Sequence, residues 1–191
     1  MKDTALITAI HEAGHVVADL VIAEQQRLPS PVNAVWIMSE DDGWSGMCES
    51  GPARWQEVHR IICGAPGTPS ETIEHCRKIA WQDCISYLAG PVAETRWRYR
   101  SRTAAQLYGY QLADRFADGD YSKGSDFGRT RVRLTWRNSA KVNESILAAW
   151  IESEELIARH WKRVVEFARW LARDGQISGD DINDWWARGS I

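Results

Sequence analysis

Residues 4–26 read TALITAIHEAGHVVADLVIAEQQ, and this stretch decides the fold. Its apolar residues recur at the spacing of one helix face, at positions Leu6, Ile10, Val17, Leu20 and Val21. The pattern predicts one helix over the whole stretch. Because the polar string HEAGH interrupts the apolar run, we expect neither a membrane span nor a signal peptide. A cytoplasmic location is then the default expectation.

The string His11-Glu12-Ala13-Gly14-His15 carries the candidate chemistry. Two histidines four residues apart lie on the same helix face, so both imidazoles can reach one ion. Zinc accepts such nitrogens in tetrahedral sites. A glutamate beside the first histidine is placed to take a proton from metal-bound water. We therefore predict one Zn²⁺ per chain, with His11 and His15 as ligands and Glu12 as the general base.

Gly14 lies inside this predicted helix. A glycine there costs about 1 kcal/mol relative to alanine. Its presence indicates that another element packs closely against the helix at this point.

A zinc site that keeps one position open for water needs a third protein ligand. The candidates are acidic residues on elements that can fold back onto the helix. Asp126 follows a Gly-Ser turn at a predicted helix start, Glu94 follows a Gly-Pro pair, and Asp118 and Asp120 lie in a predicted loop. The residues alone leave this choice open.

The four cysteines contain no C-x-x-C pair, and we interpret them as buried thiols and not as disulfides. A second Cys/His metal site can be drawn, but its irregular spacing makes it the weaker interpretation. Its residues are His59, Cys63, His75 and Cys76.

A small sheet is predicted after the first helix. Pro29 and Pro31 end the helix. Residues 32–38 are rich in Val, Ile and Trp and predict a strand. The acidic turn at residues 40–43 precedes residues 44–49, which predict a returning second strand.

The middle of the chain predicts helix with interruptions. Residues 51–69 contain several Gly and Pro and are interpreted as partly irregular. A helix is predicted from Ser70 towards Leu88, and Gly90-Pro91 predicts a bend or break before helix resumes.

The second half of the chain also predicts mostly helix. We expect helix over residues 102–117, a loop at 118–120, and a helix near Asp126 capped by Ser125. A single long helix is predicted over residues 140–173. Asp174-Gly175 should end it, and Ser178 with Asp181 predicts a capping box for a last short helix.

The composition is that of an ordinary folded domain. The chain has 191 residues, of which 44% are hydrophobic and 26% are charged, so it can bury a real core. Its net charge of −3 gives no support for a broad nucleic-acid-binding surface.

The chain resembles the peptidase domain of FtsH-type ATP-dependent zinc proteases. Residues 9–18, AIHEAGHVVA, are similar to that family's catalytic helix. Residues 32–38 followed by Gly46-Met47-Cys48 resemble its strand and glycine turn, and residues 87–94, YLAGPVAE, resemble its signature ending in Ala-Glu. Residues 123–127, KGSDF, resemble the segment that supplies an aspartate ligand, and the tail from residue 171 resembles the closing helices.

This resemblance implies specific roles. It supports His11 and His15 as ligands, and it implies Asp126 as the third. Glu94 falls where the family has a glutamate near the site, so it becomes a candidate for orienting a histidine. The family's edge strand pairs with extended substrate, a role that falls here on Val35, Trp36 and Ile37.

The expected fold is mainly α (α+β): a zincin-like helical domain with a small β-sheet and a C-terminal helical bundle. The resemblance implies one FtsH-like peptidase domain over residues 1–191, with the metal-site part at 1–139 and C-terminal helices at 140–191. The expected activity is zinc-dependent endopeptidase cleavage of flexible or unfolded polypeptides.

The chain departs from the family in its ATPase. FtsH enzymes carry membrane helices and an AAA+ ATPase before the peptidase, whereas this chain contains no Gly-x-x-x-x-Gly-Lys-Ser/Thr phosphate loop. We expect no ATPase activity of its own, and a homo-oligomer or a separate ATPase as partner. The alternative function is a non-catalytic, metal-containing adaptor or peptide-binding protein that retains the protease fold.

Overall fold

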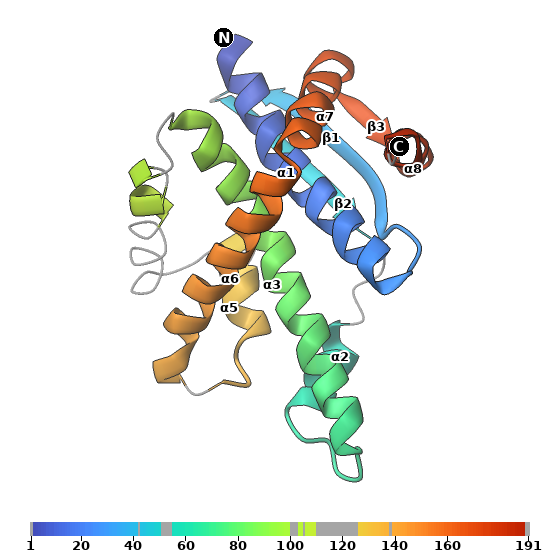
Figure 1. Ribbon diagram of the computed structural model, residues 1–191, viewed down its shortest axis with the longest axis vertical. Helices are drawn as coiled ribbons and strands as arrows, with labels where there is room; N and C mark the ends of the chain where they lie inside the picture. Colours follow the sequence, from blue (N-terminus) through green and yellow to red (C-terminus); the bar gives the residue numbers. More distant parts are fainter. Residues whose placement is uncertain are drawn as a thin grey trace.

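The computed structural model describes residues 2–41, 43–50, 55–99, 103–104, 106–109, 126–137 and 139–189. Helix dominates, as the sequence predicts, with helices α1 (Lys2–Gln26), α2 (Trp55–Ile62), α3 (Ser70–Arg98), α5 (Asp126–Arg133), α6 (Ser139–Arg159), α7 (Trp161–Asp174) and α8 (Gly179–Arg188). A small antiparallel sheet completes the fold, with strands β1 (Val32–Glu40), β2 (Gly43–Ser50) and β3 (Gln176–Ser178) in the order β2-β1-β3. The fold class is therefore mainly α with a small sheet (Figure 1).

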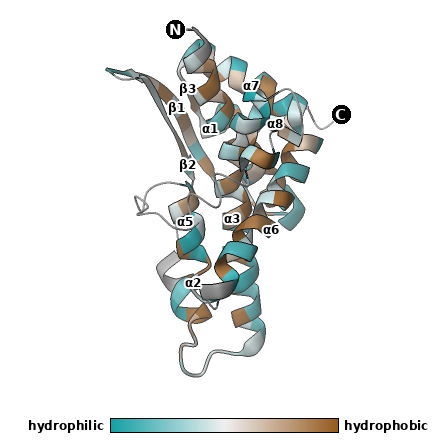
Figure 2. Cartoon of the chain, turned by 90° about the vertical axis from the view of Figure 1, so that its left-hand side faces the viewer, coloured by the Kyte–Doolittle hydropathy of each residue, from teal (hydrophilic) through white to brown (hydrophobic). Residues whose placement is uncertain are grey.

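Helix α1 is the centre of the molecule. It packs against α3 and α7 on one side and against β1 and β2 on the other. The hydropathy-coloured view shows the sheet as a thin layer beside the helices (Figure 2). Residues on several sides of α1, including Ala9, Ile10, Ala13 and Val17, have no exposed surface. A helix that is apolar nearly all round is typically buried in this way.

By length and hydropathy alone, residues Thr4–Gln26 could cross a membrane. In the folded chain, 67% of the apolar window in this helix is buried inside the protein, as in a core helix. The same helix carries His11, Glu12 and His15.

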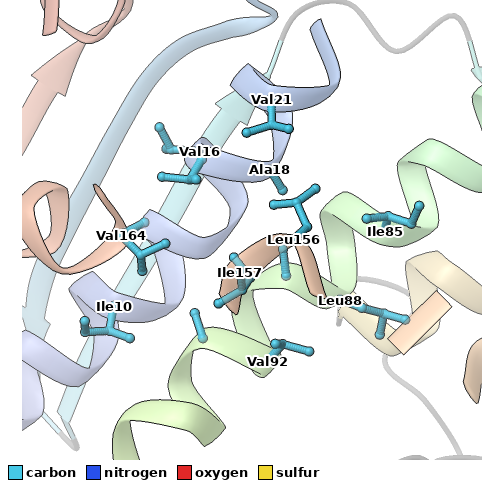
Figure 3. Packing of buried hydrophobic residues seen from close by; sticks show 14 of the residues in the cluster. Ile10, Val16, Ala18, Val21, Ile85, Leu88, Val92, Leu156, Ile157 and Val164 are labelled. Atoms are coloured by element: carbon cyan, nitrogen blue, oxygen red, sulfur yellow. The ribbon is translucent and has the colours of Figure 1, made fainter. Parts of the chain in front are cut away.

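The core lies where α1 meets α3, α6 and α7. Figure 3 shows Ile10, Ala18 and Val21 of α1 opposite apolar residues of the other three helices, among them Leu88, Ile157 and Val164. A Cβ built on Gly14 would lie 2.4 Å from the carbonyl oxygen of Ala89. The close packing predicted at Gly14 is confirmed, because α1 and α3 approach too closely there for any side chain.

Helix α3 differs from the sequence prediction at Gly90-Pro91. The helix is continuous from Ser70 to Arg98, with Pro91 in its interior. Proline removes one helical hydrogen bond and normally bends or breaks a helix. Here the residues on both sides of the pair, Leu88, Ala89 and Val92, are buried in the core, and this packing holds the helix together across the proline.

The long helix predicted over residues 140–173 is two helices. α6 ends at Arg159 and α7 begins at Trp161, and His160 between them has φ −106° and ψ 16°. The prediction was wrong because α6 packs mainly on α3 whereas α7 packs mainly on α1. The chain has to turn between these two partners.

The ends of the last two helices follow the prediction. Gly175 has φ 79° and its N–H donates to the carbonyl of Leu171, which ends α7. The Ser178 hydroxyl accepts a hydrogen bond from the N–H of Asp181 and caps α8.

The remaining predictions divide into three groups. Residues 55–62, expected to be irregular, form α2, which packs on the lower part of α3 around Ile62, Cys76 and Ala80. Residues 103–104 and 106–109 are helical. The rest of the helix predicted over 102–117, the loop at 118–120 and the cap Ser125 lie outside the described residues.

Candidate metal centre

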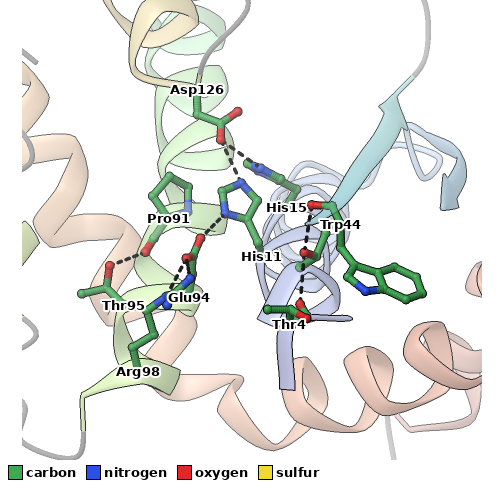
Figure 4. Close-up of polar contacts among 10 residues, drawn as sticks. Thr4, His11, His15, Trp44, Pro91, Glu94, Thr95, Arg98 and Asp126 are labelled. Carbon is green, nitrogen blue, oxygen red and sulfur yellow. Dashed lines mark hydrogen bonds and ion pairs between the residues drawn. The ribbon is translucent and has the colours of Figure 1, made fainter. Parts of the chain in front are cut away.

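Two imidazoles and one carboxylate converge between α1 and α5. His11 and His15 stand one turn apart on α1, and Asp126 is the first residue of α5. The Oδ2 atom of Asp126 lies 2.9 Å from Nε2 of His11 and 3.5 Å from Nε2 of His15. Ligand atoms of the three residues lie within 4.8 Å of one another, so this group can hold a metal ion (Figure 4).

The other nitrogen of each imidazole is already engaged. Nδ1 of His11 lies 3.0 Å from Oε2 of Glu94, and Nδ1 of His15 lies 2.8 Å from the carbonyl oxygen of Ser86. A carbonyl can only accept, so Nδ1 of His15 carries a proton, and Nε2 holds the lone pair when the imidazole is neutral. Glu94 imposes the same arrangement on His11 when that imidazole is neutral. Both Nε2 lone pairs then face Asp126, as metal binding requires.

Glu94 also has a partner of its own. The guanidinium of Arg98, one turn further along α3, donates from Nε to Oε1 of Glu94 at 2.7 Å. The two carboxylate oxygens of Glu94 are therefore divided between Arg98 and His11. Glu94 does not belong to the three-residue group that can hold an ion. Its geometry fits the expected role of orienting a histidine.

Gly90 leaves the space in which the imidazoles meet. A Cβ built there would lie 2.3 Å from Nε2 of His15 and 2.8 Å from Nε2 of His11. Any side chain at this position would enter the space beside both ligand nitrogens. Gly90, at which the sequence predicts a helix break, is therefore required because any larger residue would fill the space between the two imidazoles.

Glu12 lies in the same cavity but outside the group of three. Its side chain packs over Gly46 of β2, where an added Cβ would lie 2.6 Å from Cγ of Glu12. Only 6% of Glu12 is exposed. Burial raises the pKa of Glu12 above its ordinary value, while the two histidines and the backbone N–H of Cys48 act in the opposite direction.

The pKa values of His11 and Asp126 depend on each other, because the two side chains are in contact. Burial opposes a positive charge on His11, but the hydrogen bonds to Asp126 and Glu94 outweigh it and raise the pKa of His11 to about 10. Burial likewise opposes the charge on Asp126, but the two imidazoles lower the pKa of Asp126 well below its ordinary value. The centre thus combines anionic oxygen and imidazole nitrogen, a donor set that suits a divalent cation.

A cavity of about 500 Å³ surrounds these groups. Residues of α1, α3, α5 and β2 line it, including Glu12, Asp19, Met47, Tyr87 and Arg129. The cavity therefore joins the candidate metal ligands to one strand of the sheet.

That strand is β2, and this corrects the expectation for Val35, Trp36 and Ile37. These residues lie on β1, the central strand. Val35 and Trp36 pair with β2 and β3, and Ile37 pairs with Gly46 of β2 on one side and donates its N–H to the carbonyl of Gly175 on the other. They have no free edge for an extended peptide. Within the described residues, the outer edge of β2 is the one left open beside the cavity.

The alternative ligands that the structure describes do not join the centre. Asp118 and Asp120 lie outside the described residues. His59 and Cys63 contact each other, with Sγ 3.6 Å from Nε2. Across the described ranges, however, the group able to hold an ion is the one formed by the two α1 histidines and Asp126. All four cysteines are free thiols; Cys76 and Cys84 are buried as expected, whereas Cys48 is half-buried and Cys63 is exposed.

The sequence analysis did not predict three residues as part of the site: Asp19, Ser86 and Gly90. Asp19 could have been predicted from its spacing, because it follows His15 by four residues and so lies on the same helix face. Ser86 acts through its backbone carbonyl, and no side-chain pattern indicates such a role.

No known protein family matches the sequence, and no curated protein matches it.

Proposed function

We propose that this protein is a zinc-dependent metalloendopeptidase that cleaves flexible or unfolded polypeptides. One observation carries the proposal: Nε2 of His11, Nε2 of His15 and Oδ2 of Asp126 converge in a cavity that also contains a buried glutamate outside the ligand group. A purely structural zinc site has four closed protein ligands and needs no such residue. Three ligands leave one coordination position for water.

The donor set favours zinc among divalent ions. Two imidazole nitrogens and one carboxylate oxygen are ordinary ligands of catalytic zinc, which prefers tetrahedral coordination. Zinc bound there would polarise the scissile carbonyl and lower the pKa of water. Glu94 and the Ser86 carbonyl would hold the two imidazoles in the tautomer that binds metal.

Glu12 is the proposed general base. Its burial raises its pKa and strengthens it as a proton acceptor. It would take a proton from the attacking water and pass it to the leaving amine. The backbone N–H of Cys48 and the packing over Gly46 hold the carboxylate at the cavity wall.

The open edge of β2 supports an extended substrate. Gly46, Met47 and Cys48 belong to this strand and line the cavity. A polypeptide added beside them would be held by backbone hydrogen bonds, which give little sequence selectivity. Only a flexible or unfolded segment can adopt this conformation.

The test is Glu12→Gln. Zinc should remain at one per chain, because Glu12 is not a ligand, and cleavage of an unfolded substrate should fall by about 10²–10⁴-fold. Glu24→Gln is the matched control, since Glu24 is exposed on the same helix and its variant should cleave normally. Zinc with no cleavage by the unaltered protein would instead favour the non-catalytic adaptor. Full cleavage by Glu12→Gln would disprove the mechanism.

A further inference from the structure

Asp19 continues the line of His11 and His15 along α1. The three residues are spaced by four, so they lie on one helix face, and each step advances about 6 Å along the axis. Asp19 lines the same cavity as the two histidines. Its partners come from the other cavity walls, Ser50 at the end of β2 and Ser86 on α3.

Asp19 accepts hydrogen bonds from two hydroxyls, and the positive group that acts on it is the imidazole of His15. The Ser86 hydroxyl donates to Oδ1 at 2.5 Å and the Ser50 hydroxyl donates to Oδ2 at 2.7 Å. Within the described part of the chain, no lysine or arginine forms an ion pair with Asp19. The two guanidinium groups at the cavity are engaged elsewhere, Arg98 with Glu94 and Arg129 over the ring of Tyr87.

A carboxylate in this position is not needed for any step of the proposed reaction. Two neutral hydroxyls satisfy its hydrogen bonding but do not balance its charge. Burial raises the pKa of Asp19, because the two hydroxyls and the imidazole of His15 do not offset the loss of water, so its charged form is favoured when an opposite charge is brought to it. A cation entering the cavity would supply that charge.

We propose that Asp19 forms a subsite for the side chain of a lysine or arginine in the substrate, beside the bond that is cleaved. This inference rests on the proposed peptidase function of the same cavity. Asp19 lies one helical turn beyond His15, so a residue held at the metal centre can reach it with a long, flexible, basic side chain. The Ser50 and Ser86 hydroxyls orient the two carboxylate oxygens towards this role.

The subsite is tested by measuring peptide affinity, because a binding measurement does not depend on catalytic turnover. The zinc-loaded Glu12→Gln protein is titrated with fluorescent peptides that carry one lysine, and with peptides that carry norleucine instead at the same position. Norleucine keeps the four-carbon stem and removes the charge. When the lysine stands at the position whose side chain reaches Asp19, we expect the lysine peptide to bind about tenfold more tightly than the norleucine peptide.

Asp19→Asn in the same background should bring the ratio of the two Kd values close to one. Asparagine can still hydrogen-bond both serines, and an unchanged melting temperature would verify the fold. Asp41→Asn is the matched control, because Asp41 is exposed in the hairpin turn, and there the ratio should remain about tenfold.

Equal affinity of the two peptides for the Glu12→Gln protein, or no binding of either, would overturn the subsite. A lysine preference that survives Asp19→Asn would also overturn it. A preference that depends on Asp19, combined with no cleavage by the unaltered protein, would keep the subsite and reject the peptidase function.

Discussion

The Nδ1 atom of His11 lies 3.0 Å from Oε2 of Glu94, although the two residues are 83 positions apart in the chain. This contact joins α1 to α3 and selects the nitrogen of His11 that faces Asp126. The candidate centre therefore depends on a carboxylate that is not itself a ligand. Its importance can be measured directly.

Glu94→Gln should weaken zinc binding by about 10–100-fold. The amide keeps the size of the side chain but loses the charge that fixes the imidazole. Affinity is measured by competition with a chelator of known strength. Glu74→Gln is the control, because the Glu74 side chain on the same helix is 76% exposed. Equal affinities for the two variants would contradict the role given to Glu94.

Gly90→Ala should abolish stoichiometric metal binding while the protein stays folded. The added Cβ would enter the space beside both Nε2 atoms, with only 2.3 Å to that of His15. Alanine favours helix by about 1 kcal/mol over glycine, so the loss cannot come from a weakened α3. Metal content and circular dichroism are measured on the same sample. An alanine variant that retains one zinc per chain would show that the site is built differently.

Zinc affinity should rise with pH through the neutral range. His11 has a pKa of about 10 in the metal-free centre, because the hydrogen bonds to Asp126 and Glu94 outweigh the effect of burial. Below that pH the imidazole is protonated and must lose its proton to bind metal. Affinity should therefore increase about tenfold per pH unit between pH 6 and 8.

Calorimetry in buffers of different ionisation enthalpy measures the protons released. We expect at least one proton per zinc at pH 7. An affinity that does not change with pH, with no proton release, would exclude a protonated His11.

Arg133→Met should destabilise the fold by about 1–3 kcal/mol. The buried Arg133 donates to Oδ2 of Asp83 and to the hydroxyl of Tyr87, each at 2.8 Å, and so fastens α5 to α3. Its loss leaves Asp83, whose side chain is 35% exposed, without its cation. Urea denaturation measures the change. Lys141→Met, at an exposed position on α6, should change stability by less than about 0.5 kcal/mol.

Local patterns predicted much of the fold. The first helix, the two-stranded hairpin, the glycine end of α7 and the serine cap of α8 depend on neighbours a few residues away, and the structure confirms them. The continuity of α3 through Pro91 and the turn at His160 depend on what each segment packs against. The short strand β3 exists only because β1 lies beside it.

The sequence by itself determined that two histidines share one helix face with a glutamate between them, because residues four apart in a helix are neighbours whatever surrounds it. Only the tertiary structure decided which carboxylates meet them. Asp126 lies 115 positions from His11, Glu94 comes from a helix whose course depends on core packing, and the open strand beside them is β2 and not β1. Contacts between residues so far apart arise from the packing of whole elements, which no local spacing records.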